Sequence, residues 1–244
     1  MTPDTAPCLH IDGARATIRL RRPLEHNRID PSDLAVLLDH LEQARSDKAV
    51  RALVLTGTGN KTFSSGYTVA AIREHLDDRL EKVLDTLESL PLAVVCALNG
   101  SAYGGAIDLA LCCDFRIGVK GSRMFMPAAK FGLHYYPGGI RRFVTRLGLS
   151  SAKKLLLTAQ AIDADEMLRI GFLTELVDAD QLEPAVARYV DALIECEPGV
   201  VASMKLQINR AADGIIDLAA QRAAYEQSLR SDELALRLQA LAKA

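Results

Sequence analysis

The sequence predicts an α/β protein in which parallel strands alternate with helices. Two short runs, residues 52–56 and Ala93–Leu98, are almost wholly apolar, as expected of strands buried on both faces of a parallel sheet. A glycine-containing loop follows each run, and an amphipathic helical pattern lies between them. This strand–helix–strand order favours parallel sheet layers with right-handed crossovers.

The elements around these two strands follow from local patterns. Residues 16–20 predict a short strand, and the leucines between positions 34 and 41 recur on one face of a helix that Pro31 opens. Leucine and valine at helical spacing over residues 80–90 predict a second helix, which Pro91 ends.

The second half of the chain is predicted to become mainly helical. Residues 106–113 read as a helix and Phe115–Val119 as a third strand, after which helices dominate from about Gly138. Asp163 with Glu166 resembles a capping box, and Pro198 opens a later helix. We therefore expect a core over residues 1–190 and a C-terminal helical region over residues 191–244.

Composition excludes several classes of protein. The 244 residues include 29 basic and 31 acidic side chains, a balance that gives no sign of a nucleic-acid partner. The five cysteines lack metal-binding spacing and fit a reducing cytoplasm. The N-terminus lacks the apolar core of a signal peptide, and no apolar run approaches the ~20 residues of a membrane span. We expect a soluble cytoplasmic protein with no metal and no membrane partner.

The two glycine loops, residues 61–66 and 99–108, are the main functional signal. Each follows a buried strand, so both should emerge at the same edge of a parallel sheet, where such folds bind ligands. Gly104 and Gly105 precede a predicted helix and let the backbone approach a ligand closely. The unpaired N–H groups of that helix start would suit a developing oxyanion.

Other interpretations of these loops fit less well. The run GTGNKT lacks the glycine before lysine of a Walker A loop, GSAYGG is not GxGxxG, and no GxSxG elbow occurs. Each loop taken singly is also compatible with a turn that only connects two elements.

The segments FSSG and NGSAYGGAIDLALCCDFRI, about 35 residues apart, resemble the crotonase (enoyl-CoA hydratase/isomerase) superfamily pattern. RPLEHNRI, FMPAAKFGL, PGGIRRFVTRLG and PGVVASMK extend the likeness over most of the chain. The resemblance implies a spiral ββα core with a C-terminal helical region, assembled as a homotrimer or a dimer of trimers. It also implies an acyl-CoA substrate, with coenzyme A present only as part of the thioester and no permanently bound cofactor.

The resemblance further implies that two backbone N–H groups, carried over to Ser65 and Gly105, hold the thioester carbonyl as it becomes an enolate. Hydratases of the family use two glutamates, whose positions here fall on Asp108 and Ala128. A further acidic residue of dienoyl isomerases falls on Tyr136, which is not expected to replace it. The loss of the second carboxylate weakens the case for hydration and favours decarboxylation or isomerisation.

The segment around residues 127–135 resembles the methylmalonyl-CoA decarboxylase-like branch, where a tyrosine at the position of Tyr135 lines the site. Decarboxylation forms an enolate without a base, so it tolerates Ala128. Asp108 and Tyr135 are thus candidate catalytic residues. Each residue also has a non-catalytic interpretation. Asp108 could only complement the dipole at a helix start, and Tyr135 could be a partly buried loop tyrosine without a chemical role. His134 is expected to be an exposed or hydrogen-bonding residue and not a base.

The coenzyme A contacts implied by position involve the N-terminal loop, the first glycine loop and a basic residue near the C-terminus. They are Leu24, His26, Arg28, Lys61, Phe63, Gly66 and Lys205, with Arg21 and Arg22 as further candidate phosphate partners. Val69, Ile72, Leu76 and Phe131 are expected to shape the acyl pocket. The alternative to an enzyme is a non-catalytic acyl-CoA-binding or scaffold relative, which Ala128 motivates.

Overall fold

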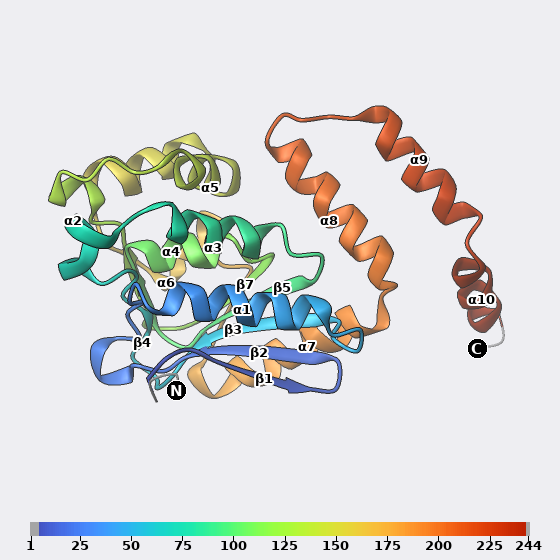
Figure 1. Cartoon of the computed structure of the whole chain (residues 1–244), viewed down its shortest axis with the longest axis horizontal. Helices are drawn as coiled ribbons and strands as arrows, with labels where there is room; N and C mark the ends of the chain where they lie inside the picture. Colours follow the sequence, from blue (N-terminus) through green and yellow to red (C-terminus); the bar gives the residue numbers. More distant parts are fainter. Residues whose placement is uncertain (1–4, 243–244) are drawn as a thin grey trace.

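The computed structural model describes residues 5–242. The first four residues of the predicted core and the last two of the predicted C-terminal helical region lie outside the described residues. A six-stranded sheet forms the centre of the fold, in the order β1-β2-β3-β5-β7-β10 (Figure 1). All neighbouring pairs are parallel except β1 and β2. These strands are β1 (Cys8–Asp12), β2 (Arg15–Leu20), β3 (Ala52–Gly57), β5 (Ala93–Leu98), β7 (Phe115–Val119) and β10 (Glu175–Val177).

A second, smaller sheet has the order β4-β6-β8-β9. Its first three strands each follow a strand of the large sheet along the chain: β4 (Thr62–Ser64) follows β3, β6 (Ser101–Tyr103) follows β5, and β8 (Arg123–Phe125) follows β7. The chain therefore repeats one spiral turn. This repetition places residues 61–66 and 99–108, the two glycine loops, on one side of the molecule, where β4 within the first pairs with β6 within the second.

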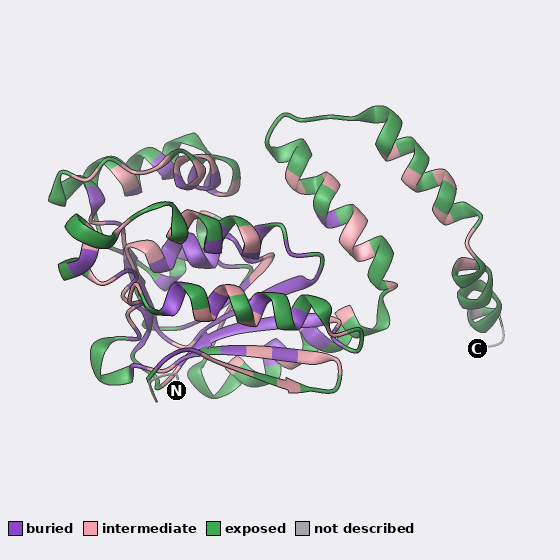
Figure 2. Cartoon of the chain, viewed as in Figure 1, coloured by how far each residue is buried: buried purple, intermediate pink, exposed green. Residues whose placement is uncertain are grey.

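Alternating side chains of the large sheet enter two different cores. Leu53 and Leu55 face one cluster, and Val54 and Val95 face the other, as the two-residue period of a strand requires. The first core contains the apolar faces of α1 (Asp33–Ser46), α3 (Asp78–Glu88) and α4 (Gly105–Leu111), and the second that of α7 (Leu182–Glu195). Figure 2 shows the buried residues concentrated on these elements.

The predicted elements of the first half are confirmed, with Ala93–Leu98 and Phe115–Val119 at the predicted bounds. The prediction missed β1, whose residues are half-buried at an edge and show no continuous apolar run. It also missed β9 (Ile162–Asp163), β10 and the strands of the small sheet, β4, β6 and β8, which are all too short to leave a periodic pattern. The remaining helices of the body are α2 (Ile72–His75), α5 (Pro137–Thr158) and α6 (Ala164–Arg169).

Three C-terminal helices extend away from the body as an arm: α8 (Pro198–Ala212), α9 (Leu218–Leu229) and α10 (Asp232–Leu241) (Figure 1). Lys205 ties α8 to the sheet, because its buried ammonium donates to the carbonyl of Leu92 (2.9 Å) and to Asp114 Oδ2 (2.8 Å). The expectation that Lys205 binds a phosphate of coenzyme A is therefore wrong, since this cation is already bound inside the fold.

The arm leaves large apolar side chains in solvent, including Met204, Ile208, Leu218, Leu229 and Leu236. Within residues 5–242, no helix is both long enough and apolar enough to cross a membrane.

Candidate active site

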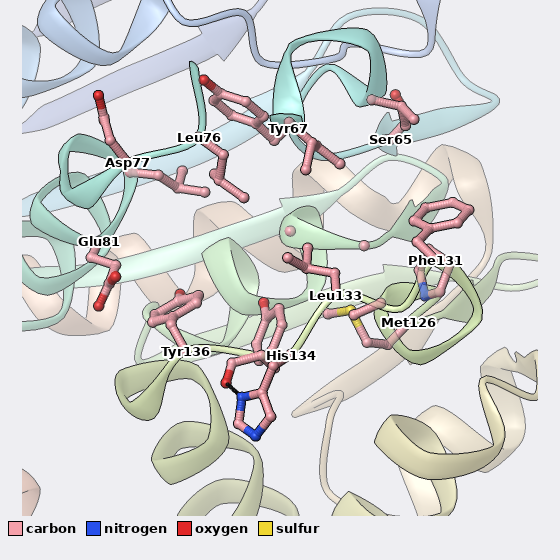
Figure 3. Close-up of a pocket in the computed structure, with 18 of the residues that line it drawn as sticks. Ser65, Tyr67, Leu76, Asp77, Glu81, Met126, Phe131, Leu133, His134 and Tyr136 are labelled. Atoms are coloured by element: carbon pink, nitrogen blue, oxygen red, sulfur yellow. Dashed lines mark hydrogen bonds between the residues drawn. The ribbon is translucent and has the colours of Figure 1, made fainter. Parts of the chain in front are cut away.

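A cavity of about 320 Å³ opens where the two glycine loops meet α3 and the segment before α5 (Figure 3). Apolar side chains form most of its wall, among them the four that the sequence predicts for the acyl pocket. The apolar wall includes Val69, Ile72, Leu76, Leu80, Phe131 and Leu133. The four predicted residues thus line one cavity, which is suited to an apolar ligand with a few polar groups.

The two glycine loops touch each other at this cavity. A Cβ built on Gly66 would lie 2.7 Å from the backbone nitrogen of Gly105, so no larger residue fits there without moving that nitrogen. The φ angle of Gly66 is +80°, a conformation that other residues rarely adopt. Gly66 is thus required by both its conformation and its close contact, and it is buried beneath the site.

Ser65 does not offer a free donor to this cavity. Its N–H donates to the carbonyl of His26 at 2.8 Å, which turns the amide away from Gly105. The side chain of Ser65 still lines the cavity. The prediction that the Ser65 amide holds an oxyanion is therefore wrong for this structure, because the positive φ of Gly66 changes the direction of the backbone between residues 65 and 67.

The N–H of Tyr67 takes the place predicted for Ser65. Ile29 binds Gly66 O and Thr68 N on one side of this segment, which leaves the N–H of Tyr67 on the opposite side. A Cβ built on Gly105 would lie 3.6 Å from Tyr67 N, so the two amides are neighbours. Within residues 5–242 neither the Tyr67 N–H nor the Gly105 N–H has a hydrogen-bond partner, and Gly105 begins α4.

Asp108 lies one turn into α4 and is completely buried. Tyr135 donates to its Oδ2 at 3.3 Å, Tyr136 donates to the same oxygen at short range, and Arg142 Nη1 lies 3.5 Å from Oδ1. The two tyrosines line the cavity, whereas Asp108 does not. The carboxyl group is therefore connected to the cavity by hydrogen bonds from two tyrosine hydroxyl groups.

Burial sets the proton affinities in this cluster. It raises the pKa of Asp108 above the usual value, although Arg142 and the two hydroxyl groups oppose the shift. Burial also raises the pKa of Tyr135 and of Tyr136, and the nearby charge of Asp108 adds to both shifts. Both tyrosines thus remain protonated at neutral pH and can act as hydrogen-bond donors.

The loop between β8 and α5 supplies the opposite wall. Ala128, at the start of a 3-10 helix (Ala128–Phe131), is nearly buried and presents only a methyl group to the cavity. Gly139 leaves room for the ring of Tyr135, since a Cβ there would lie 2.2 Å from that ring. His134 lies at the rim, where Nδ1 bonds the carbonyl of Tyr135 (2.8 Å) and the ring points away from the other lining residues (Figure 3).

The residues expected to contact coenzyme A fall into two groups. Leu24 and Lys61 are exposed, and His26 is exposed with Nδ1 2.9 Å from the hydroxyl of Thr62. Arg28 is half-exposed and paired with Glu25 and with Asp30 (2.8 Å). These four residues lie on loops beside Ser65, where a ligand could reach them.

Phe63 and Arg22 do not belong to that surface. Phe63 is fully buried in the first core, so its ring cannot contact a cofactor and that expectation is wrong for the side chain. Arg22 is buried against Asp33, with Nη2 3.0 Å from Oδ1. Both side chains support the fold beneath the site.

The sequence interpretation missed three residues of the site: Tyr67, Tyr136 and Arg142. Arg142 is fully buried and also contacts Asp85 and Glu88 of α3, so it links α3 to Asp108. Nothing in the spacing of Arg142 distinguishes it from a solvated helical arginine. Tyr136 could have been found from the sequence, because it is adjacent to the candidate Tyr135 and two neighbouring tyrosines in a segment before a helix can both face inward.

Spiral α/β topology, the paired glycine loops and an apolar cavity with two free amides define a protein of the crotonase fold. Comparison with known proteins agrees: the family described as enoyl-CoA hydratase/isomerase matches residues 11–234. This chain belongs to the enoyl-CoA hydratase/isomerase family.

Several relatives illustrate the match. A crotonyl-CoA hydratase from Syntrophomonas wolfei is 31% identical over 211 residues, which cover 84% of this chain and 81% of the relative. A short-chain-enoyl-CoA hydratase from Clostridium acetobutylicum is 31% identical over 218 residues, covering 86% and 84%. A solved enoyl-CoA hydratase/carnithine racemase from Magnetospirillum magneticum has a TM-score of 0.90 at 24% identity, covering 99% of this chain and 94% of that one, which shows the shared fold.

Proposed function

We propose that this protein binds an acyl-CoA, stabilises its thioester enolate and moves a proton along the acyl chain as an isomerase does. The observation that carries this proposal is the meeting of two unbonded amides, Tyr67 N–H and Gly105 N–H, at an apolar cavity that two tyrosine hydroxyls also line.

The two amides would act on the thioester oxygen. When a proton leaves the α-carbon, negative charge develops on that oxygen, and fixed backbone donors stabilise it without reorganising. Removal of one such donor typically costs about 10²–10³ in rate. Because both donors are backbone groups, the geometry depends on Gly66, whose missing side chain lets the loops approach.

Asp108 would take up the proton through Tyr135. As the α-carbon releases its proton to Tyr135 Oη, the hydroxyl passes its own proton to Asp108 Oδ2, so no free tyrosinate forms. The reverse transfer returns a proton to the γ-carbon of the dienolate, and the double bond moves by one position. The raised pKa of Asp108 makes its carboxylate a stronger base for this step than an exposed aspartate.

Hydration of an enoyl thioester is less well supported. A hydratase must hold and activate a water molecule, and Ala128 offers no acid or base at the wall where the family's second glutamate would stand. The open cavity supports an enzyme over a non-catalytic scaffold, for which an occluded pocket is expected.

Decarboxylation is the second candidate, as in the methylmalonyl-CoA decarboxylase-like branch. The observation in its favour is the methyl wall at Ala128 together with the hydroxyl of Tyr135 at the cavity. Loss of carbon dioxide would supply the enolate without a base, and the same two amides would stabilise it.

The coenzyme A part of the substrate is proposed to lie over the exposed loop residues beside Ser65, with Lys61 and Arg28 nearest its phosphates. The arm of α8, α9 and α10 is proposed to pack on neighbouring copies in a homotrimer or a dimer of trimers, which would cover its exposed apolar side chains.

The test is to incubate purified protein with trans-3-hexenoyl-CoA, crotonyl-CoA and methylmalonyl-CoA and to identify products by mass spectrometry. The proposal predicts conversion of the 3-enoyl thioester to its 2-enoyl isomer. Hydration of crotonyl-CoA as the main activity, or no reaction and no binding with any of the three, would contradict it.

A further inference from the structure

The charged residues around the cavity are all acidic. Asp77, Asp78 and Glu81, from the start of α3, line it, whereas no lysine or arginine does so within residues 5–242. Of the cations on the first turns of α3, Arg79 is paired with Asp77, and Lys82 lines an adjoining surface groove that Asp78 and Glu81 also border. The cavity wall is thus apolar with a negative rim.

Two of these acids are not neutralised by a close partner. Asp77 is paired with Arg79, whose Nε lies 2.9 Å from its carboxylate. Asp78 and Glu81 have neither a hydrogen bond through their carboxylates nor a salt bridge anywhere in the part of the chain that the structure describes. Asp78 is exposed to solvent, whereas Glu81 is half-buried, so less water screens the charge of Glu81 than that of Asp78.

The polar groups deeper in the site do not offset this charge for an anionic ligand. The hydroxyl protons of Tyr135 and Tyr136 are both directed at Asp108 Oδ2, so the oxygens that remain free there are acceptors. The carboxyl group of Asp108 lies directly behind them. The Ser65 hydroxyl lies at the other end of the cavity from Glu81, and the His134 ring points away. A ligand carboxylate near Glu81 would therefore find no free donor beyond the two backbone amides, which the thioester oxygen needs.

The rim lies where the far end of an acyl chain would reach. Figure 3 shows Ser65 and Phe131 at one end of the cavity and Asp77 and Glu81 at the other. The exposed loop residues that would contact coenzyme A lie beside Ser65, since the carbonyl of His26 binds the Ser65 amide. A thioester entering from that end therefore points its acyl chain toward Leu76, Leu80 and Glu81.

We infer that the site selects uncharged aliphatic acyl groups and rejects longer acyl groups that end in a carboxylate, such as adipoyl. This inference rests on the proposed acyl-CoA function and gives its substrate class.

The test compares three thioesters of matched acyl length: hexanoyl-CoA, adipoyl-CoA and the methyl ester of adipoyl-CoA. Binding to the full-length protein is measured by calorimetry at low and high salt. We expect hexanoyl-CoA to bind at least about tenfold more tightly than adipoyl-CoA at low salt, because like charges in a poorly screened site repel. The methyl ester, which has the size of the dicarboxylic chain without its charge, should bind nearly as well as hexanoyl-CoA.

The double variant Asp78→Asn/Glu81→Gln should bind adipoyl-CoA more tightly and so reduce the difference in affinity between hexanoyl-CoA and adipoyl-CoA. The control Glu74→Gln, on α2 outside the cavity, should leave this difference in affinity unchanged. Adipoyl-CoA binding to the natural protein as tightly as hexanoyl-CoA, or more tightly, would overturn the inference. An affinity ratio of these two ligands that is the same in the double variant would also overturn it, as would a failure of all three ligands to bind. Selective binding without any isomerase activity would leave the inference intact and refute the proposed reaction.

Discussion

At the scale of single residues, the candidate site contains a carboxyl group that lies behind the cavity wall and does not line the cavity. Asp108 is enclosed by Tyr135, Tyr136 and Arg142, and its Oδ1 has no hydrogen-bond partner within residues 5–242. A buried, incompletely bonded carboxylate is costly to maintain, and such groups are concentrated at functional sites. In the proposed reaction, Asp108 would act as a positioning and proton-accepting group behind Tyr135.

The substitution Asp108→Asn tests this role. It keeps the shape of the side chain but removes the base, so we expect proton transfer to slow by about 10²–10⁴-fold while the KM for the acyl-CoA changes little. Tyr135→Phe should have a similar effect on kcat. Full activity of either variant in the 3-hexenoyl-CoA assay would remove that residue from the mechanism.

The pH dependence has a defined sign. The basic form of Asp108 is the ionised one, so activity should rise with pH through the pKa of this group and fall as acid protonates it. Because burial raises that pKa, the acidic limb of kcat against pH should lie above 3.8, the ordinary value for aspartate. The residual activity of the Asp108→Asn variant should show no acidic limb in its profile of kcat against pH. A limb at or below the ordinary value would contradict the assignment.

At the scale of secondary-structure elements, the contact between the two glycine loops determines the site. Gly66→Ala would place a methyl group 2.7 Å from Gly105 N in a backbone conformation that disfavours alanine. We expect it to displace the two amides and reduce kcat about 10²-fold or more, as the loss of an oxyanion donor does.

Gly121→Ala is the matched control for this substitution. Gly121 also has a positive φ, +78°, but a Cβ there would meet nothing within 4 Å. It carries the same backbone strain without the contact, so its activity should stay close to that of the natural protein. Equal losses in the two variants, measured alongside their melting temperatures, would show that strain alone is responsible.

The attachment of α8 is a second element-scale feature. Lys205→Met removes the ammonium that binds Asp114 and the carbonyl of Leu92, which leaves buried acceptors without their donor. We expect the free energy of unfolding in urea to fall by about 1–3 kcal/mol. Coenzyme A affinity, measured for the folded variant, should not change. A specific loss of affinity with normal stability would restore Lys205 as a phosphate ligand.

At the scale of the whole molecule, the exposed apolar side chains of the arm suggest that the isolated chain is not the final assembly. If the arm packs on neighbouring copies, the 26.5 kDa chain should sediment as a trimer or a hexamer, and Ile208→Asp on α8 should shift it toward smaller species. A monomer at micromolar concentration in analytical ultracentrifugation would refute this expectation.

Much of the fold followed from sequence because its signals are local. Buried parallel strands such as Ala93–Leu98 read as continuous apolar runs, and Pro198 marks a helix start. The edge strand β1 was missed because its half-exposed side chains show no such run.

The site was predicted only in part, for reasons of geometry. The two loops, Asp108 and four residues that line the cavity were identified, but Ser65 was chosen where Tyr67 presents the free amide. The direction of an amide depends on the φ of Gly66 and on the bond to His26, which no residue pattern specifies. The buried partners of Arg142 and Lys205 likewise depend on packing between distant helices.

The proposed mechanism requires that Tyr67 N–H and Gly105 N–H hold one thioester oxygen. The decisive measurement is a crystal structure with a bound, unreactive acyl-CoA. We expect the thioester oxygen to lie about 2.7–3.1 Å from both nitrogens, with the α-carbon facing Tyr135. A thioester oxygen bound elsewhere, or beside only one of these amides, would contradict it.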